Sequence, residues 1–193
     1  MTPVYTPDEE RILLGLARDT LRAVTRNQTP PPVDLDKLPA ALLEPRACFV
    51  TLRRRSDGAL RGCTGTLVAR RQLALEVIEM TGQTALNDPR FMPVTASEVP
   101  GLHIEISVLS PPQALQFDSP DDLLHKLRPG IDGVTLLLDD RRATFLPQVW
   151  ESYPDPRLFL SLLSEKMGRS PDAWRDPRLH VETYQATVIE EAA

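Results

Sequence analysis

A β-hairpin signal near residue 57 constrains the fold of this chain more than any other local feature. Residues 47–52 and residues 60–67 are two largely apolar runs on either side of Asp57-Gly58. Asp-Gly between such runs favours a tight turn that joins antiparallel strands. Residues 134–138 and 142–146 flank Asp139-Asp140 in the same way. Two hairpins in one chain argue against a sheet built from regular βαβ units.

The first hairpin also predicts which side chains share a face. With a two-residue loop, Leu52 lies opposite Cys63, so Cys63 shares the apolar face of the hairpin with Cys48 and Leu52. The two cysteines are not partners in this register. A β-bulge at one of the glycines would exchange the faces.

The first helix is marked by Thr6-Pro7-Asp8-Glu9, which supplies a capping threonine, an early proline and the glutamate of a capping box. It should end near Asn27. The order of helices and strands predicts an α+β fold with a mainly antiparallel sheet and flanking helices. The remaining helices are expected at residues 71–86, 119–128 and 155–167, and further strands at residues 102–109 and 180–189.

Asp-Pro-Arg occurs three times, at residues 88–90, 155–157 and 176–178. The spacing is irregular, so these tripeptides are not an internal repeat. Because aspartate caps helices and proline suits their first turn, each tripeptide is interpreted as a possible helix start.

Composition narrows the classes of protein that the chain can belong to. It has 193 residues, a net charge of −5 and no run close to the roughly 20 apolar residues of a membrane helix. The N-terminal residues lack the basic and apolar regions of a signal peptide, so a cytoplasmic location is expected. The net charge makes nucleic acid an unlikely partner. Runs of arginine at residues 53–55, 70–71 and 141–142 are either solvated turns or part of an anion site.

Residues 60–67, Leu-Arg-Gly-Cys-Thr-Gly-Thr-Leu, are the strongest candidate site, and we call them the Cys63 motif. Glycine allows close backbone approach, so Gly62 and Gly65 could let amide groups converge on an anion. Arg61 would favour the reactive thiolate of Cys63, and Thr64 offers a hydroxyl. Three roles stay open for Cys63: a small buried apolar residue, a catalytic nucleophile, or a ligand-binding or redox thiol.

The motif lacks an obvious base or metal partner. A cysteine nucleophile usually works with a histidine, and His103 is the best candidate among three widely spaced histidines. The two cysteines, Cys48 and Cys63, have none of the usual zinc-ligand spacings. Neither a metal nor another cofactor is expected, and a disulfide framework is not expected either.

The Cys63 motif resembles that of the AMMECR domain family, and the resemblance extends over nearly the whole chain. It implies one AMMECR-type domain over residues 1–193, an α+β fold of two lobes around a cleft, and a suspected active site at Arg61, Gly62, Cys63 and Gly65. Thr64 departs from the isoleucine common in the family. Members similar to protein A of the AmmeMemoRadiSam group are expected to act with a Memo-like protein and a radical-SAM protein. The matching segments are residues 47–52, 60–67, 88–91, 105–109, 127–130 and 142–150.

The last of these segments, residues 142–150, has two interpretations. Thr144 offers a hydroxyl within an apolar run that ends at Trp150. The run either packs in a core or forms one wall of the cleft, in which case Thr144 is a candidate ligand-binding residue. Two functions therefore remain: a cysteine-centred enzyme or small-molecule-binding component of a modification pathway, and a non-catalytic scaffold that acts with a Memo-like protein.

Overall fold

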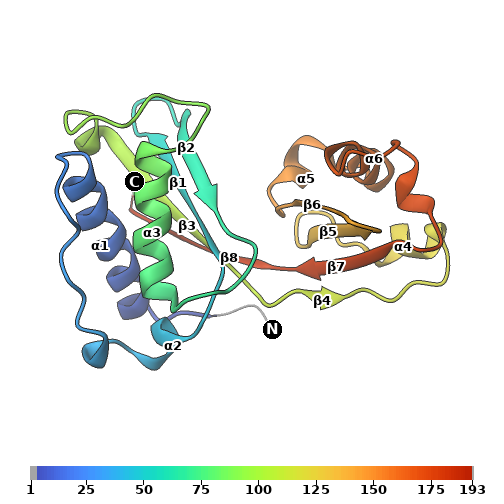
Figure 1. Cartoon of the computed structure of the whole chain (residues 1–193), viewed down its shortest axis with the longest axis horizontal. Coiled ribbons are helices and arrows are strands. Elements are labelled where there is room, and N and C mark those ends of the chain that lie inside the picture. The colour runs from blue at the N-terminus through green and yellow to red at the C-terminus, as the bar shows by residue number, and fades with distance from the viewer. Residues whose placement is uncertain (1–3, 193) are drawn as a thin grey trace. The chain divides into compact units, whose positions relative to one another are not determined.

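The computed structural model describes residues 4–192, which form two compact units (Figure 1). The first unit comprises the chain up to residue 110 and the residues from 187 onward, and the second comprises residues 111–186. Each unit contains a four-stranded sheet with helices, and the strands pair antiparallel. The predicted α+β class is thus confirmed. None of the helices within residues 4–192 has the length and apolar character to cross a membrane.

The sheet of the first unit has the strand order β2-β1-β3-β8. Helices α1 and α3 lie side by side over one face of this sheet (Figure 1). Their apolar residues pack against Val50, Leu52, Ile104 and Ile106, all fully buried. The elements of this unit are α1 (Pro7–Val24), α2 (Ala40–Leu43), β1 (Cys48–Arg54), β2 (Leu60–Gly65), α3 (Leu73–Leu86), β3 (Leu102–Leu109) and β8 (Ala186–Glu190), with 3-10 turns at Leu35–Lys37 and Val99–Gly101.

Helix α1 begins as the sequence predicts. The Thr6 hydroxyl accepts the Glu9 N–H at 3.3 Å, and the Glu9 carboxylate accepts the Thr6 N–H at 2.8 Å. This reciprocal capping box satisfies two backbone donors that a helix start leaves free. The helix ends at Val24, and Asn27 takes the left-handed conformation just beyond it.

The predicted register of the first hairpin is wrong by one residue. A bulge between Leu52 and Arg53, together with a turn longer than two residues, places Cys63 opposite Thr51 and Gly62 opposite Leu52. Because side chains alternate along a strand, the shift moves Cys63 to the face opposite the helices. Cys48 stays in the helix-covered core, so the two cysteines lie on opposite faces.

The second unit is built on the strand order β4-β7-β5-β6. In its core the rings of Trp150 and Phe159 stack with centroids 3.6 Å apart, and the Trp150 indole N–H donates to the Asp132 carbonyl at 2.7 Å. Its elements are β4 (Gln113–Ala114), α4 (Pro120–Lys126), β5 (Gly133–Leu138), β6 (Arg141–Phe145), α5 (Val149–Ser152), α6 (Pro156–Lys166), a 3-10 turn at Ala173–Arg175 and β7 (His180–Tyr184).

The strand expected at residues 180–189 is two strands. Residues 180–184 form β7 and pair with β5 in the second unit, whereas residues 186–190 form β8 in the sheet of the first. The apolar alternation continues through both, and only the change of partner divides them. Sequence periodicity reports a strand but does not report which sheet it joins.

Candidate functional site

Cys63 lies on β2, which is the edge strand of the first sheet. Its half-buried side chain lies on the face opposite the helices. The Thr51 hydroxyl, directly across on β1, donates to the Cys63 Sγ at 3.4 Å. Glu105 of β3 is the next residue in this row, opposite Thr51. The thiol therefore has a hydroxyl donor beside it and a carboxylate one strand farther away.

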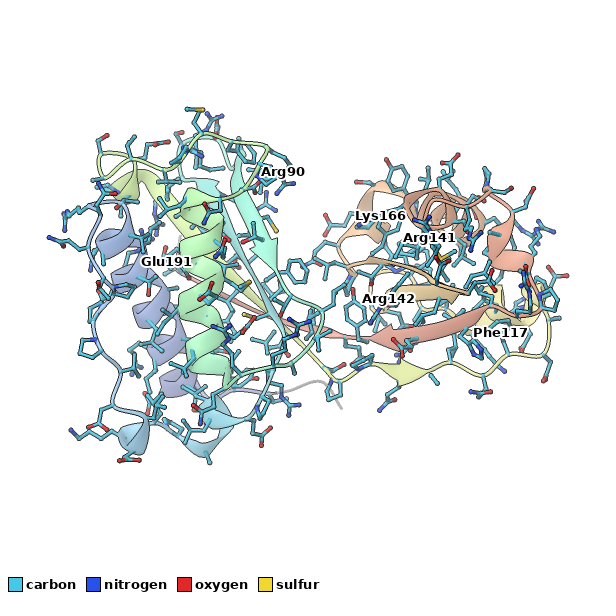
Figure 2. The ribbon with its side chains drawn as sticks, in the orientation of Figure 1. Arg90, Phe117, Arg141, Arg142, Lys166 and Glu191 are labelled. Carbon is cyan, nitrogen blue, oxygen red and sulfur yellow. The ribbon has the colours of Figure 1, made fainter. Side chains whose placement is uncertain are left out.

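The backbone of Cys63 is held from outside the sheet by Asp88 and Arg90, which we call the Cys63 clamp. The Cys63 N–H donates to the Asp88 Oδ2 at 2.8 Å, and the Arg90 Nη2 donates to the Cys63 carbonyl at 2.9 Å. Figure 2 shows the Arg90 side chain beside β2. The clamp satisfies both polar groups of an edge-strand residue, so they cannot serve as a preformed oxyanion site.

Asp88 is a buried carboxylate that the clamp keeps ionised. It accepts two further bonds from Arg90 side-chain nitrogens, at 2.9 and 2.7 Å, and one from the Arg90 N–H at 3.1 Å. The bonds from the Arg90 side chain, with that from the Cys63 N–H, outweigh the effect of burial and hold the pKa of Asp88 well below its usual range. A negative charge therefore stays next to the Cys63 backbone at neutral pH.

Arg61 is committed to another carboxylate. Its Nε donates to the Glu98 Oε1 at 2.8 Å, and its guanidinium lies 5.9 Å from the centroid of the Phe91 ring. The bond from Arg61 is the main cause that lowers the pKa of Glu98 to about 2. Arg61 thus fixes the loop after α3 against β2, and its proposed role in ligand binding would require the Glu98 pair to open.

The two glycines of the motif are required by close packing. A Cβ on Gly62 would lie 2.9 Å from the Thr84 carbonyl oxygen, and one on Gly65 would lie 2.5 Å from the Cys48 carbonyl oxygen and against the Phe49 ring. Neither glycine has a positive φ, so both are required for their size and not for a special backbone conformation. Their smallness lets β2 approach α3 on one face and Phe49 on the other.

Thr64 points toward the helices rather than toward Cys63. Its hydroxyl lies 2.7 Å from the Thr84 hydroxyl of α3, and Thr84 in turn donates to the Val50 carbonyl at 3.1 Å. This bridge links α3 to both strands of the hairpin. The ligand-binding role predicted for Thr64 is not tested by this geometry, but its hydroxyl is already bonded.

Thr144 lies in the second unit, on β6, and is buried. Its hydroxyl donates to the Val134 carbonyl at 2.9 Å and lies 2.9 Å from both the Thr135 and the Tyr184 hydroxyls. Burial of Tyr184 raises the pKa of its phenol to about 12. Thr144 thus belongs to a polar network inside its own sheet.

The other residues considered as partners of Cys63 lie elsewhere in the fold. His103 is opposite Arg53 on the same sheet, and its Nε2 lies 3.4 Å from Glu190. Within residues 4–192 no histidine is hydrogen-bonded to Cys63. Burial raises the pKa of the Cys48 thiol, which keeps it protonated. The described part of the chain brings no three histidine, cysteine or acidic residues together as metal ligands.

The clamp was missed at the sequence level although Asp-Pro-Arg signals it. In each of the three tripeptides the aspartate side chain accepts a hydrogen bond from the backbone N–H of the arginine two residues later, at 3.1, 2.9 and 2.9 Å. This is a turn formed by an aspartate side chain, and a helix follows directly only at Pro156. The tripeptide thus predicts an aspartate that is fixed beside an arginine, not always a helix start.

Comparisons with known proteins agree on one family. The model of the AMMECR1 family matches residues 14–189. A protein of Methanothermobacter thermautotrophicus is 35% identical, with 97% of this chain and 98% of that protein covered. Protein MJ0810 of Methanocaldococcus jannaschii is 33% identical over 81% of this chain and 79% of its own. The crystal structure of the uncharacterised protein PH0010 from Pyrococcus horikoshii matches with a TM-score of 0.85 and 30% identity, covering 96% of this chain and 93% of that one.

Proposed function

Because the chain belongs to the AMMECR1 family, we propose that it is a cysteine-centred enzyme or small-molecule-binding protein whose working group is the Cys63 thiol. One observation carries this proposal. The other polar side chains of the Cys63 motif are bonded to the loop after α3 or to α3 itself, whereas the thiol has the Thr51 hydroxyl and the Arg90 guanidinium beside it. The contacts of the motif therefore hold the Cys63 sulfur atom in one position, and this sulfur is the group we assign to the function.

The proposed chemistry is attack by the Cys63 thiolate on an electrophilic atom of a small molecule. The thiol proton leaves to water, and the sulfur lone pair forms the new bond to the electrophilic atom. The bond from that atom to its leaving group breaks, and the leaving group departs with the electron pair and takes a proton from water. A hydroxyl that donates to sulfur stabilises the thiolate more than the thiol, which is the role we give to Thr51. The clamp on the Cys63 backbone keeps the thiol in one position, so less entropy is lost when the ligand is attacked.

Alkylation kinetics test this function. Iodoacetamide is added to the folded protein, and labelling of the two cysteines is followed by mass spectrometry of their separate peptides, over a range of pH. We expect fast labelling of Cys63 and very slow labelling of the fully buried Cys48. Thr51→Val, which removes the hydroxyl and keeps the shape, should slow the labelling of Cys63 about three- to tenfold at neutral pH, because a thiolate loses its donor.

Two results would contradict the nucleophile role. One is a Cys63 thiol that is inert in the folded protein. The other is a labelling rate and pH profile equal to those of an unfolded cysteine peptide and unchanged by Thr51→Val. Ser107→Ala on β3 is the matched control, since it also removes one hydroxyl from this face but stands opposite Phe49 rather than Cys63.

A second candidate function, a module that binds a Memo-like protein and acts with a radical-SAM protein, is favoured by an exposed residue beside the clamp. Met92 is 81% exposed and follows Phe91, whose ring lies near both the Arg61 and the Arg90 guanidinium groups. An exposed methionine next to an aromatic–arginine cluster suits a protein interface.

Pull-down with the purified Memo-like protein separates the two functions. Met92→Glu should abolish binding if this surface is the interface. Val4→Glu, at another highly exposed apolar residue of the same unit, should not. Binding that survives Met92→Glu would contradict the interface. Binding that needs Met92 but not the Cys63 thiol would favour the scaffold function over the enzyme.

A further inference from the structure

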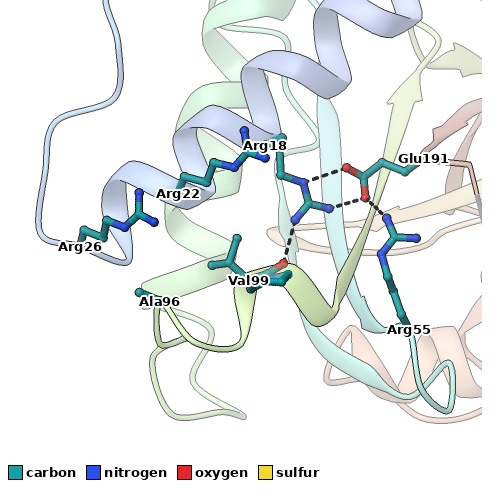
Figure 3. A pocket seen from close by; sticks show the side chains of 8 residues that line it. Arg18, Arg22, Arg26, Arg55, Ala96, Val99 and Glu191 are labelled. Carbon is teal, nitrogen blue, oxygen red and sulfur yellow. Dashed lines mark hydrogen bonds and ion pairs between the residues drawn. The ribbon is translucent and has the colours of Figure 1, made fainter.

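A pocket of about 360 Å³ in the first unit is lined by four arginines and one glutamate, and we call it the arginine pocket (Figure 3). Arg18 and Arg22 come from α1, Arg26 comes from the turn just beyond its end, and Arg55 comes from the turn between β1 and β2. Glu191 follows β8. Ala96, Val99 and Pro100 supply the apolar part of the wall. The pocket shares no lining residue with the Cys63 motif or the Cys63 clamp.

Arg18, Arg22 and Arg26 follow one another at intervals of four residues and form a row. Arg18 and Arg22 lie on one face of α1, roughly 6 Å apart along its axis, and Arg26 lies in the turn beyond the helix. Figure 3 shows Arg18 and Arg22 on the helix and Arg26 at the turn that follows it. Like charges at this spacing repel and weaken a helix. Arg18 and Arg22 therefore repel each other along the helix, and an anion bound between them would reduce the repulsion.

One end of the row is held rigid. The Arg18 guanidinium forms an ion pair with Glu191 and donates to the Val99 and Leu102 carbonyls at 3.0 and 2.8 Å. Arg55 donates to the same Glu191 carboxylate at 2.8 Å. Because the donors of Arg18 and Arg55 are mostly bonded to Glu191 and to backbone carbonyls, this end is a rigid, positively charged wall that attracts an anion by its charge.

The other end of the arginine row, at Arg22 and Arg26, is free to bind a ligand. The Arg22 side chain is 56% exposed and pairs only with Asp19, at 3.2 Å and equally exposed, which is a weak surface pair. Within residues 4–192 Arg26 forms no ion pair, and its side chain lines the pocket. Two guanidinium groups can therefore turn toward a ligand.

The charge of the pocket indicates the class of ligand. Four arginines and one glutamate give the lining a net charge of +3, within a chain whose net charge is −5. A single phosphate monoester carries about −1.5 to −2 charges near neutral pH, so a charge of +3 matches two phosphoryl groups better than one. Guanidinium groups bind phosphate oxygens in pairs, and the apolar wall can receive an organic group attached to them.

From this geometry we infer that the arginine pocket binds a small molecule that carries a diphosphate, with Arg22 and Arg26 as the residues that close on it and Arg18 and Arg55 as its fixed floor. The volume is that of a small-ligand site rather than of a nucleic-acid groove. The inference does not rest on the proposed function of Cys63, since the two sites have no residue in common.

Isothermal titration with inorganic pyrophosphate and with ADP tests this inference, in buffer without divalent metal. We expect one saturable site per chain whose affinity falls as the ionic strength rises. Arg22→Gln and Arg26→Gln should each weaken binding about tenfold, because each removes a charge-assisted bond to phosphate. Arg11→Gln is the matched control: Arg11 is exposed, lies on the same helix and pairs with Asp8 three residues earlier, as Arg22 does with Asp19.

Any of the following results would overturn the inference: no saturable binding of pyrophosphate or ADP, equal loss of affinity in Arg11→Gln and Arg22→Gln, or tighter binding of citrate. Tighter binding of duplex DNA than of ADP would replace the small molecule by a nucleic acid and would also overturn it. All of these variants change exposed residues, so circular dichroism should show unchanged folding. Cys63→Ser should keep full affinity, which separates a failure here from a failure at the thiol.

Discussion

Replacing Asp88 by asparagine tests whether the clamp fixes the Cys63 backbone. Asparagine keeps the shape and one acceptor, but it removes the negative charge and turns one oxygen into an NH₂ group. In the native protein that oxygen, Oδ2, accepts the Cys63 N–H at 2.8 Å and an Arg90 nitrogen at 2.7 Å. In the variant either a donor faces the Cys63 N–H or the amide flips and faces Arg90.

The expected loss of stability follows from these contacts. A hydrogen bond to a charged acceptor contributes about 1.5–3 kcal/mol, and an unsatisfied buried donor costs a similar amount. The ion pair with Arg90 adds less than about 1 kcal/mol, because the Arg90 side chain is half exposed and solvent screens it. We therefore expect Asp88→Asn to lower the free energy of unfolding of the first unit by about 2–3 kcal/mol.

Cys48 provides a specific probe of this unit. Both tryptophans belong to the second unit, so tryptophan fluorescence does not report on the first. Cys48 is fully buried in the core of the first unit, and its thiol is labelled only when that unit opens. A loss of 2–3 kcal/mol should raise its labelling rate about 30- to 150-fold in native buffer.

Asp57→Asn is the matched control. Asp57 lies in the same unit and accepts the Ala59 N–H and two Arg54 nitrogens, but it is exposed. Its replacement should change Cys48 labelling far less. If Asp88→Asn and Asp57→Asn have equal effects, or if Asp88→Asn leaves the rate unchanged, the reasoning about the clamp is wrong.

The pH dependence of the same variant gives an independent check. In the folded protein the pKa of Asp88 lies below its value in the unfolded chain, which is near 4. The ionised Asp88 carboxylate therefore contributes fully to stability above about pH 4, and this contribution is lost as the pH falls through the folded-state pKa. The difference in free energy of unfolding between wild type and Asp88→Asn should be constant from about pH 5 to 7 and should shrink in more acidic buffer. Urea denaturation followed by circular dichroism measures it. A difference that stays constant into strong acid would mean that the charge is not its source.

Three further changes test packing, with Cys48 labelling as the measurement for the two glycines. Gly65→Ala should destabilise the first unit by at least about 2 kcal/mol, because its Cβ would lie 2.5 Å from a carbonyl oxygen; an unchanged labelling rate would contradict this. Gly15→Ala, at an exposed position of α1 with no atom within 4 Å of the new Cβ, should stabilise that unit by about 0.5–1 kcal/mol. Trp150→Phe should destabilise the second unit by about 1–3 kcal/mol, since the Asp132 carbonyl loses its indole donor; urea denaturation followed by fluorescence of the remaining Trp174 measures it, and an unshifted midpoint would refute it.

Elements that depend on neighbouring residues were predictable from the sequence. The capping box at Thr6 and Glu9 fixes the start of α1, and strict alternation places β3 at residues 102–109, where it is observed. The hairpin at Asp139-Asp140 is likewise observed, with Asp139 in the left-handed conformation. These signals act over a few residues and are complete in the sequence.

Features that depend on distant partners were not predictable. The bulge between Leu52 and Arg53 changes the register by one residue and reverses the face of Cys63. Glu98 is visible as the end of a capping box with Thr95, but nothing in the sequence indicates that it binds Arg61, 37 residues earlier. Asp88 is visible in Asp-Pro-Arg, yet its bond to the Cys63 N–H exists only when α3 packs on the hairpin.

The corrected register changes the meaning of the whole motif. On the apolar face, Cys63 would be one more core residue, and the glycines and threonines around it would need a ligand to explain them. On the opposite face, Gly62, Thr64 and Gly65 are explained by contact with α3 and with Phe49, and Arg61 by Glu98. These contacts account for every neighbour of the cysteine but not for the cysteine, since a serine or an alanine would fit the same backbone bonds to Asp88 and Arg90. Packing therefore explains the residues around Cys63, but it does not explain why a thiol stands at this position. A thiol that its neighbours hold in place is the arrangement we expect if the sulfur atom itself takes part in the function.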